Sequence, residues 1–168
     1  MFPRAALLLA AVAIVSCSAE GPPEDPGPVG RTYSALTVDQ EIAKGGCTSS
    51  VVQGLSDQIL EELTKCVEPG FLVKVPSGGN LVNNANHPFL EKPAADGLKA
   101  ALAAKPGSTL TVNSMYRTVA QQYVLWRQAS CFPAVADPGR SNHETGLAFD
   151  TNDRTTWQTP LEAHGFKW

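Results

Sequence analysis

The residues with the clearest chemical potential lie in one passage, 141–150, which reads Ser-Asn-His-Glu-Thr-Gly-Leu-Ala-Phe-Asp. His143 and Asp150 both carry side chains that bind zinc when deprotonated. In a continuous strand, positions seven apart face opposite sides, but Gly146 permits a turn that brings both onto one side. The passage therefore predicts a metal site. The alternative is a loop histidine and a strand-end aspartate that only cap backbone groups, and spacing alone leaves both open.

Helices and strands must position this passage, and the apolar periodicity predicts both. We expect helices over residues 51–63, 93–104, 118–129 and 157–163, and strands over 71–75, 109–113 and 147–150. In the third helix we expect Val119, Tyr123 and Trp126 to be buried. Because the elements do not alternate as regular βαβ units, the predicted class is α+β.

The N-terminus has the pattern of an export signal. Arg4 precedes an apolar run over residues 5–15 that is too short to span a bilayer comfortably. The run ends in Ile-Val-Ser-Cys at 14–17, which resembles a bacterial lipobox, and that resemblance implies lipidation at Cys17. We therefore expect an exported protein that is lipid-anchored in the cell envelope. The alternative is ordinary signal cleavage near residues 16–19, with an incidental cysteine.

The mature chain would consist of a tether and one domain. Residues 18–46 begin with a segment rich in proline, glycine and acidic residues, which favours a flexible tether. Residues 47–168 suit a single domain. Of the cysteines, Cys47, Cys66 and Cys131 would remain in an oxidising compartment, where one disulfide can form in three ways and one cysteine is left over. The sequence does not choose among these pairings.

Composition excludes some partners. The 168 residues carry 13 basic and 16 acidic side chains, a formal net charge of -3. The basic residues are scattered along the chain, so nothing indicates a nucleic-acid surface. We expect a monomer.

The 141–150 passage also resembles the SxHxxGxAxD motif of the zinc-dependent D-alanyl-D-alanine carboxypeptidases and dipeptidases, the VanY- and VanX-like family. All five specified positions match: Ser141, His143, Gly146, Ala148 and Asp150. Upstream, Ser-Met-Tyr-Arg at 114–117, followed by Gln122, resembles the strand-end YR element of the family. Downstream, Gly165-Phe166 resembles the turn before the final metal-bearing strand. The similarity spans residues 110–168 and implies a hedgehog/DD-peptidase-like α+β domain, with a small antiparallel sheet flanked by helices.

The resemblance assigns roles to individual residues. His143 and Asp150 would be two of three zinc ligands. Arg117 would stabilise the developing oxyanion or the substrate carboxylate, although a structural ion pair at a strand end is the alternative. Ser141, Tyr116 and Gln122 would lie on the substrate side. These roles imply Zn²⁺ as the cofactor.

Other polar residues near the motifs receive weaker interpretations. Glu144 is expected to be solvated rather than to act as a base, and Trp126 is expected in the core or the cleft wall.

The sequence departs from the family at its end. The general base and the third ligand of the family lie on a strand after the Gly-Phe turn, whereas this sequence stops at Trp168. His164, two residues after Glu162, is a candidate ligand that could equally interact with a helix C-terminus, and His87 is a weaker one. We expect either a truncated peptidase or a degenerate family member.

The predicted function is a zinc metallopeptidase of the D-alanyl-D-alanine carboxypeptidase type, acting on peptidoglycan stem peptides outside the cytoplasmic membrane. The alternatives are a non-catalytic peptidoglycan-binding lipoprotein and an inactive, truncated family member.

Overall fold

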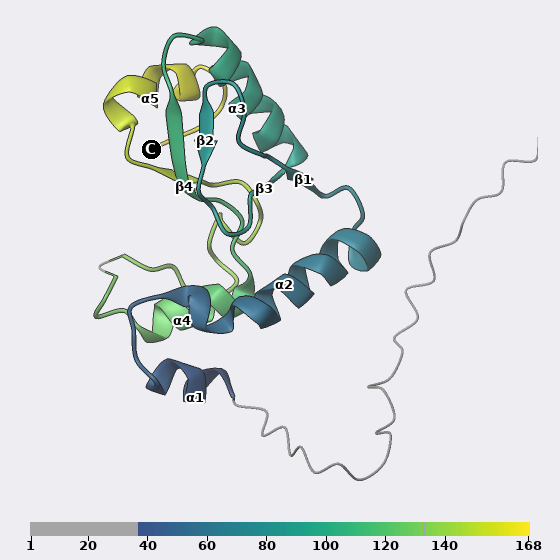
Figure 1. Ribbon diagram of the computed structural model, residues 1–168, viewed down its shortest axis with the longest axis vertical. Helices are drawn as coiled ribbons and strands as arrows, with labels where there is room; N and C mark the ends of the chain where they lie inside the picture. The colour runs from purple at the N-terminus through teal and green to yellow at the C-terminus, as the bar shows by residue number, and fades with distance from the viewer. Residues whose placement is uncertain (1–36, 133) are drawn as a thin grey trace, which may run out of the picture. The chain divides into compact units, whose positions relative to one another are not determined.

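The computed structural model describes residues 37–132 and 134–168 (Figure 1). The predicted signal sequence, the lipidation of Cys17 and most of the predicted tether lie outside these residues. None of the helices in the described part is long and apolar enough to cross a membrane.

Helical segments make up most of the regular structure. In chain order they are α1 (Val38–Ala43), the 3-10 turn η1 (Ser49–Val52), α2 (Gln53–Glu62), the π-helical turn η2 (Leu63–Val67), α3 (Lys92–Ala104), α4 (Val119–Arg127) and α5 (Arg154–Glu162). Helix α1 lies inside the range that the sequence assigns to the tether. Its N-cap Thr37 forms a capping box with Gln40, which explains why a helix begins there.

Five short strands form two sheets. They are β1 (Leu72–Lys74), β2 (Leu81–Asn83), β3 (Phe89–Glu91), β4 (Leu110–Ser114) and β5 (Asp150–Thr151). Strands β1 and β3 pair antiparallel, and the second sheet has the order β2-β4-β5. This arrangement confirms the predicted α+β class. The three-stranded sheet is mixed, however, because β2 and β4 are parallel while β4 and β5 are antiparallel. The long connection through β3 and α3 allows the parallel pairing.

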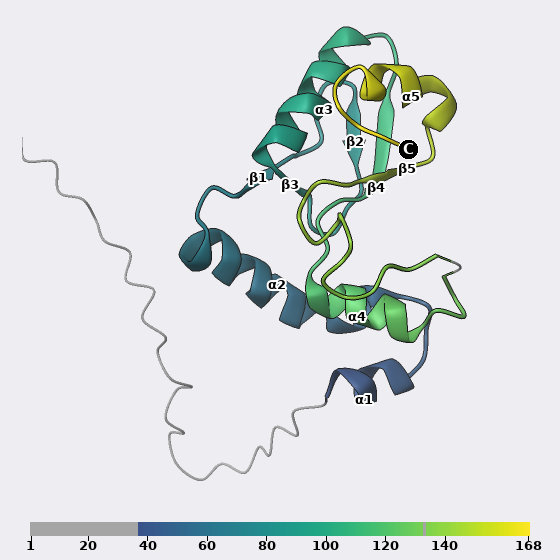
Figure 2. The same cartoon turned by 180° about the vertical axis from the view of Figure 1, so that it is seen from behind.

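The main core lies between the three-stranded sheet and helices α3 and α5, which flank β2 and β4 in both views (Figures 1 and 2). Its fully buried members come from β3, α3, β4, α5 and the residue after β4: Leu90, Leu98, Ala101, Leu110, Val112, Met115, Trp157 and Leu161. The buried indole of Trp157 donates its N–H to the carbonyl of Thr109, 2.9 Å away. This bond satisfies the polar atom of the largest core side chain and fixes α5 against the start of β4.

Helices α1, α2 and α4 pack together with the η1 turn. At their centre the hydroxyls of Ser56 and Thr118 lie 2.8 Å apart, and both side chains are fully buried. Thr118 also caps α4 through a capping box with Gln121. One threonine therefore both starts α4 and joins it to α2.

The prediction of which face of α4 is buried was wrong. Val119 is 51% exposed and Trp126 is 42% exposed, and the buried face carries Gln121, Gln122, Val124 and Leu125. The apolar spacing predicted the wrong buried face because the glutamine amides of α4 form hydrogen bonds inside the fold. Gln121 Oε1 accepts from the backbone N–H of Thr118, so its burial leaves no acceptor unsatisfied.

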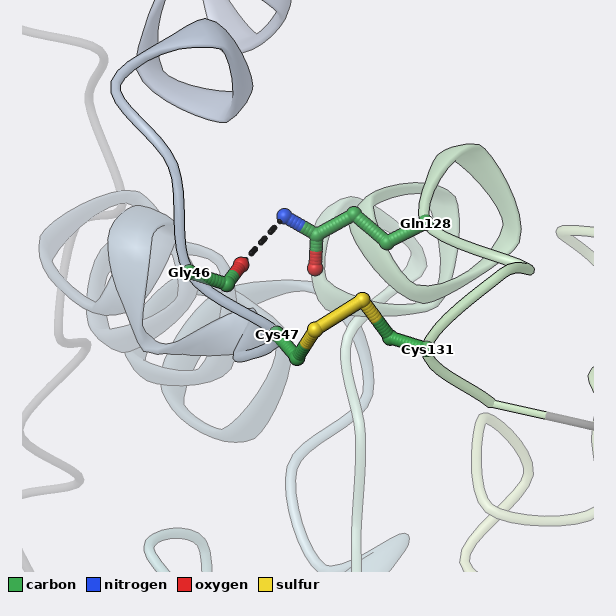
Figure 3. Close-up of a disulfide and its surroundings, with 4 residues drawn as sticks. All are labelled: Gly46, Cys47, Gln128 and Cys131. Atoms are coloured by element: carbon green, nitrogen blue, oxygen red, sulfur yellow. Dashed lines mark hydrogen bonds between the residues drawn. A yellow bond between two sulfur atoms is a disulfide. The ribbon is translucent and has the colours of Figure 1, made fainter.

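The structure selects one of the three possible disulfides, Cys47–Cys131, with Cα atoms 5.6 Å apart (Figure 3). Beside it, Gln128 donates from Nε2 to the carbonyl of Gly46 at 2.7 Å. The bond links the segment between α1 and η1 to the residues that follow α4. No cysteine in the described part of the chain is free, which corrects the expectation of a leftover thiol.

Replacing both cysteines of this bond by serine (C47S/C131S) should lower the free energy of unfolding by about 2–5 kcal/mol. The bond closes a loop with a sequence separation of 84 residues, so its loss raises the entropy of the unfolded chain. Urea denaturation followed by circular dichroism measures the change. A difference below about 1 kcal/mol would contradict this account.

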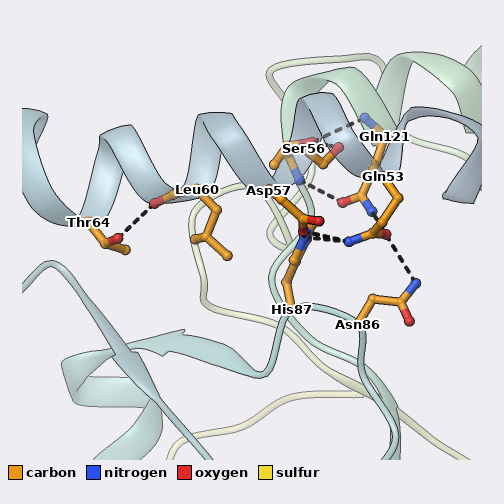
Figure 4. A network of polar contacts seen from close by, with 9 residues as sticks. Gln53, Ser56, Asp57, Leu60, Thr64, Asn86, His87 and Gln121 are labelled. Carbon is orange, nitrogen blue, oxygen red and sulfur yellow. Dashed lines mark hydrogen bonds and ion pairs between the residues drawn. The ribbon is translucent and has the colours of Figure 1, made fainter.

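A polar network joins α2 to the loop before β3 (Figure 4). The buried imidazole of His87 places Nε2 2.9 Å from Asp57 Oδ1, and Gln53 donates to the same oxygen at 2.7 Å. The hydrogen bonds from His87 and then Gln53 hold the pKa of the Asp57 carboxyl below its ordinary value. The carboxylate is therefore the preferred form in the folded protein.

This network should stabilise the fold above about pH 4 and lose its effect at more acidic pH. Because folding depresses the pKa of Asp57, its contribution is present above the unfolded pKa and disappears as the pH falls through the folded pKa. Unfolding free energies measured between pH 2.5 and 6.5 should show a deficit for Asp57→Asn that fades below pH 4. Asp96→Asn, which breaks only an exposed pair with Lys92, should show little deficit at any pH. A pH-independent deficit for Asp57→Asn would refute the assignment.

Candidate metal centre

The two predicted metal ligands lie next to each other. His143 Nε2 is 3.4 Å from Asp150 Oδ1. The other ring nitrogen, Nδ1, lies 2.7 Å from the backbone carbonyl of Met115. Because a carbonyl can only accept, Nδ1 carries a proton, and Nε2 is the ring nitrogen that faces the carboxylate. A carbonyl partner of this kind is the usual way in which a metal-binding histidine is oriented.

This separation fits a shared zinc ion. Two ligand atoms about 2.0–2.1 Å from a tetrahedral zinc lie about 3.3 Å apart. The nitrogen and oxygen of the pair match that distance, and the carboxylate is 56% exposed, so an ion can reach it from solvent. Within residues 37–132 and 134–168, no group of three or more histidine, cysteine or acidic side chains could hold a metal. The described donor set is therefore this pair.

Gly146 makes the turn between the two ligands. Its φ is +73°, a conformation that glycine adopts readily. A Cβ at this position would lie 2.7 Å from the backbone nitrogen of Glu91 and 2.7 Å from Leu72 Cδ2. Its carbonyl accepts from the N–H of Glu91 at 2.9 Å, and its N–H donates to the carbonyl of His143. Glycine is therefore favoured at position 146 for two reasons, the positive φ of the predicted turn and the close packing against β3.

Asp150 is held by β5. That strand pairs antiparallel with β4, and Asp150 is the Cα partner of Ser114. The hydrogen bond with His143 is the main reason that the pKa of Asp150 lies below its ordinary value, and the charges of His143 and Arg117 act in the same direction. Asp150 is therefore ionised at neutral pH and able to bind a cation.

Arg117 lies on the other side of Asp150. Its Nη2 is 3.7 Å from Asp150 Oδ2 and 3.4 Å from the hydroxyl of Ser114, and Nη1 donates to Gln122 Oε1 at 2.9 Å. Burial lowers the pKa of Arg117, but a guanidinium remains charged at neutral pH. The site therefore places a fixed positive charge next to the carboxylate of the metal pair.

The structure places Gln122 behind Arg117 instead of on the substrate side. Its side chain is 1% exposed, and both ends of its amide have protein partners. While Oε1 accepts from Arg117, Nε2 donates to the carbonyl of Ala136 at 2.7 Å. Gln122 thus orients the guanidinium and fixes it to the loop before the 141–150 passage.

Ser141 and Glu144 also support the ligand loop. Ser141 is buried, and its hydroxyl accepts from the backbone N–H of His143 at 3.3 Å. Glu144 was expected to be solvated. Instead its carboxylate accepts from the backbone N–H groups of Gly139 and Ser141 at 2.9–3.0 Å. These bonds hold the loop that carries His143.

A cavity of about 370 Å³ opens beside the site and is lined by Ser114, Tyr116, Arg117 and Asp150, among others. This volume is within the usual range for small-ligand sites, about 300–1,000 Å³. Tyr116 is buried in the cavity wall, and this burial raises the pKa of its phenol.

Of the two weaker metal candidates, only His87 lines the same cavity as Asp150. His164 is exposed at the end of α5 and lines a separate cavity together with Phe166. His87 is bonded to Asp57 and Gln53. Sequence reasoning missed two groups that the site uses, the hydroxyl of Ser114 and the carbonyl of Met115. Ser114 could have been found as the strand-end hydroxyl beside the YR element, whereas a backbone carbonyl leaves no signal in side-chain patterns.

Comparison with known proteins agrees with this geometry. Residues 88–167 match the family model "VanY: D-alanyl-D-alanine carboxypeptidase". The C-terminal part of the chain is therefore similar to VanY-type carboxypeptidases. A Bacillus subtilis (strain 168) protein named "Putative carboxypeptidase YodJ" is 36% identical over 86 residues, which are 46% of this chain and 32% of that protein. The chain thus spans about a third of the length of this relative. No solved structure matches this chain significantly.

Substitution of the turn glycine should disrupt the ligand pair. We expect Gly146→Ala to cost more than about 3 kcal/mol, because positive φ alone costs about 1–2 kcal/mol and the new Cβ also meets the backbone of Glu91. Gly139→Ala is a matched control, since its φ is +81° but open space surrounds its Cβ. Chemical denaturation of both variants measures the costs. Equal costs would show that close packing at Gly146 is unimportant.

Proposed function

We propose that this chain is a zinc-dependent D-alanyl-D-alanine carboxypeptidase that acts on peptidoglycan stem peptides. The observation that carries the proposal is the 3.4 Å approach of His143 Nε2 to Asp150 Oδ1, with Arg117 beside the carboxylate. The match of residues 88–167 to VanY-like carboxypeptidases supports the same reaction class.

In this proposal His143 and Asp150 hold the zinc through Nε2 and Oδ1. A zinc ion bound there would lower the pKa of a water molecule and polarise the scissile carbonyl. The carbonyl of Met115 keeps the proton of His143 on Nδ1, so that Nε2 stays available for the metal.

Arg117 stabilises negative charge on the substrate, either the oxyanion that forms during attack or the terminal carboxylate. A guanidinium suits both because it remains charged and has forked donors. Gln122 and Ser114 keep it in place before substrate binds, and such preorganisation is the main source of electrostatic catalysis. Tyr116 lines the adjacent cavity, where it can contact the peptide.

The proposed site of action is the cell envelope. Support comes from the sequence alone, that is, from the apolar run at residues 5–15 and the lipobox-like ending at Cys17. Lipidation of Cys17, a tether and action outside the cytoplasmic membrane follow as parts of the same proposal.

Metal content and product release together test the function. The full chain, stripped with a chelator and reloaded with zinc, should retain close to one equivalent and release D-alanine from a stem pentapeptide. His143→Ala and Asp150→Ala should lose zinc and activity together. His164→Ala is a matched control that should keep both, because His164 lies at the end of α5 and lines a separate cavity.

Arg117→Lys should retain zinc but reduce kcat by about 10²–10³-fold, because lysine keeps the charge but loses the forked donors. Zinc retention without release of D-alanine would favour a peptidoglycan-binding role. Failure of the wild-type chain to retain zinc would overturn the metallopeptidase proposal.

A further inference from the structure

One buried ring nitrogen in the described part of the chain has no hydrogen-bond partner. It is Nδ1 of His87, a side chain that is only 3% exposed. Native folds rarely leave such an atom unpaired, and a catalytic role is one recognised reason for it. His87 lines the same cavity as Arg117 and Asp150. The unpaired nitrogen therefore belongs to a residue of the candidate site that the proposed function does not use.

The opposite nitrogen of this ring is held by α2 (Figure 4). His87 Nε2 lies 2.9 Å from Asp57 Oδ1, and Gln53 Nε2 lies 2.7 Å from that oxygen and 2.9 Å from the ring nitrogen. Because the Asp57 carboxylate can only accept, Nε2 carries a proton. In the neutral ring the lone pair is then on Nδ1. Asp57 thus selects the tautomer in which Nδ1 can take up a proton.

His87 is also the lining group that is best suited to accept a proton near neutral pH. The other titratable groups of the cavity, among its described lining residues, are Tyr116, Arg117 and Asp150. Burial raises the pKa of Tyr116, so its phenol stays protonated. Arg117 remains a cation, and the hydrogen bond with His143 lowers the pKa of Asp150, which makes that carboxylate a poor base. An imidazole, by contrast, exchanges its proton in the neutral range.

The pair lies outside the region that resembles known carboxypeptidases. The VanY match covers residues 88–167, whereas His87 precedes it and Asp57 lies in α2. Nδ1 is shielded from solvent, and general bases often reach their hydrogen-bonding geometry only once the substrate binds. The cavity therefore combines the proposed metal ligand with an Asp–His pair that another part of the chain supplies.

We propose that His87 is a general base of this site and that Asp57 is its positioning residue. The inference rests on the proposed function and assigns the proton transfers of the hydrolysis. As water attacks the peptide carbonyl and the C–O bond forms, an O–H bond of the water breaks and its proton passes to Nδ1. The ring then gives this proton to the nitrogen of the departing D-alanine as the C–N bond breaks. Asp57 stabilises the imidazolium through Nε2–H, as the carboxylate of a catalytic triad does.

A substitution that keeps only one of the two ring functions tests this assignment. His87→Gln can still donate to Asp57 from near the position of Nε2, but it has no base. In the zinc-loaded full chain it should lower kcat for release of D-alanine from a stem pentapeptide by at least about 10²-fold, while zinc content stays at the wild-type level. His164→Gln is the matched control and should keep kcat, because His164 lines the other cavity. A wild-type kcat for His87→Gln refutes the base.

Chemical rescue separates a base from a residue that only fills space. The activity of His87→Ala should recover with added imidazole but not with pyrazole, a ring of similar size that is a much weaker base. Equal recovery with both rings, or none with imidazole, contradicts the proposal.

NMR spectra of the ring nitrogens test the tautomer without an activity assay. The chain has three histidines, and His87→Gln identifies the signal of His87. The neutral ring of His87 in the unsubstituted chain should carry its proton on Nε2, and Asp57→Asn should raise the share of the other tautomer. A neutral ring with its proton on Nδ1 excludes the base even where variants fail to fold. Failure of the unsubstituted chain to release D-alanine from the pentapeptide instead overturns the proposed function.

Discussion

Two hydrogen bonds that run in opposite directions hold the site together. The ring of His143 donates to the carbonyl of Met115, and the backbone N–H of Arg117 donates to the carbonyl of His143. The first bond orients the imidazole, and the second brings the arginine backbone to the same loop. Met115 and Arg117 both come shortly after the end of β4. This strand therefore positions the guanidinium of Arg117 and the imidazole of His143 together. Without either bond, His143 and Arg117 would no longer be held within 4 Å of Asp150.

Buried glutamine amides connect several segments around the site. Gln122 links Arg117 to the loop at Ala136, Gln128 holds Gly46, and Gln121 caps the start of α4. The burial of Gln121 and Gln122 costs little because both ends of each amide have protein partners, and neither side chain adds a charge that competes with the ligands. The helix α4 therefore uses its buried face to support the site, and its exposed apolar residues have no part in this.

The sequence predicted the parts of this structure that leave strong local signals. The range of α3 could be predicted because a proline lies in its first turn and a Pro-Gly follows its end. The strand before Ser-Met-Tyr-Arg could be predicted from the alternation of apolar and polar residues. The approach of His143 to Asp150 was foreseeable because Gly146 stands between them. By contrast, β2 and β3 have three residues each, too few for a periodicity to show, and their pairing depends on distant partners. The disulfide, the buried glutamines and the carbonyl of Met115 could not be predicted, because each depends on tertiary contacts between remote segments.

The Cys47–Cys131 link has a consequence for biogenesis. The two thiols are 84 positions apart, and Cys66 lies between them in the sequence. A bond between Cys47 and Cys66 closes a shorter loop, so during folding it competes with the native bond. Efficient maturation therefore favours a folding environment in which thiol exchange can correct early pairings, such as one supplied with a disulfide isomerase.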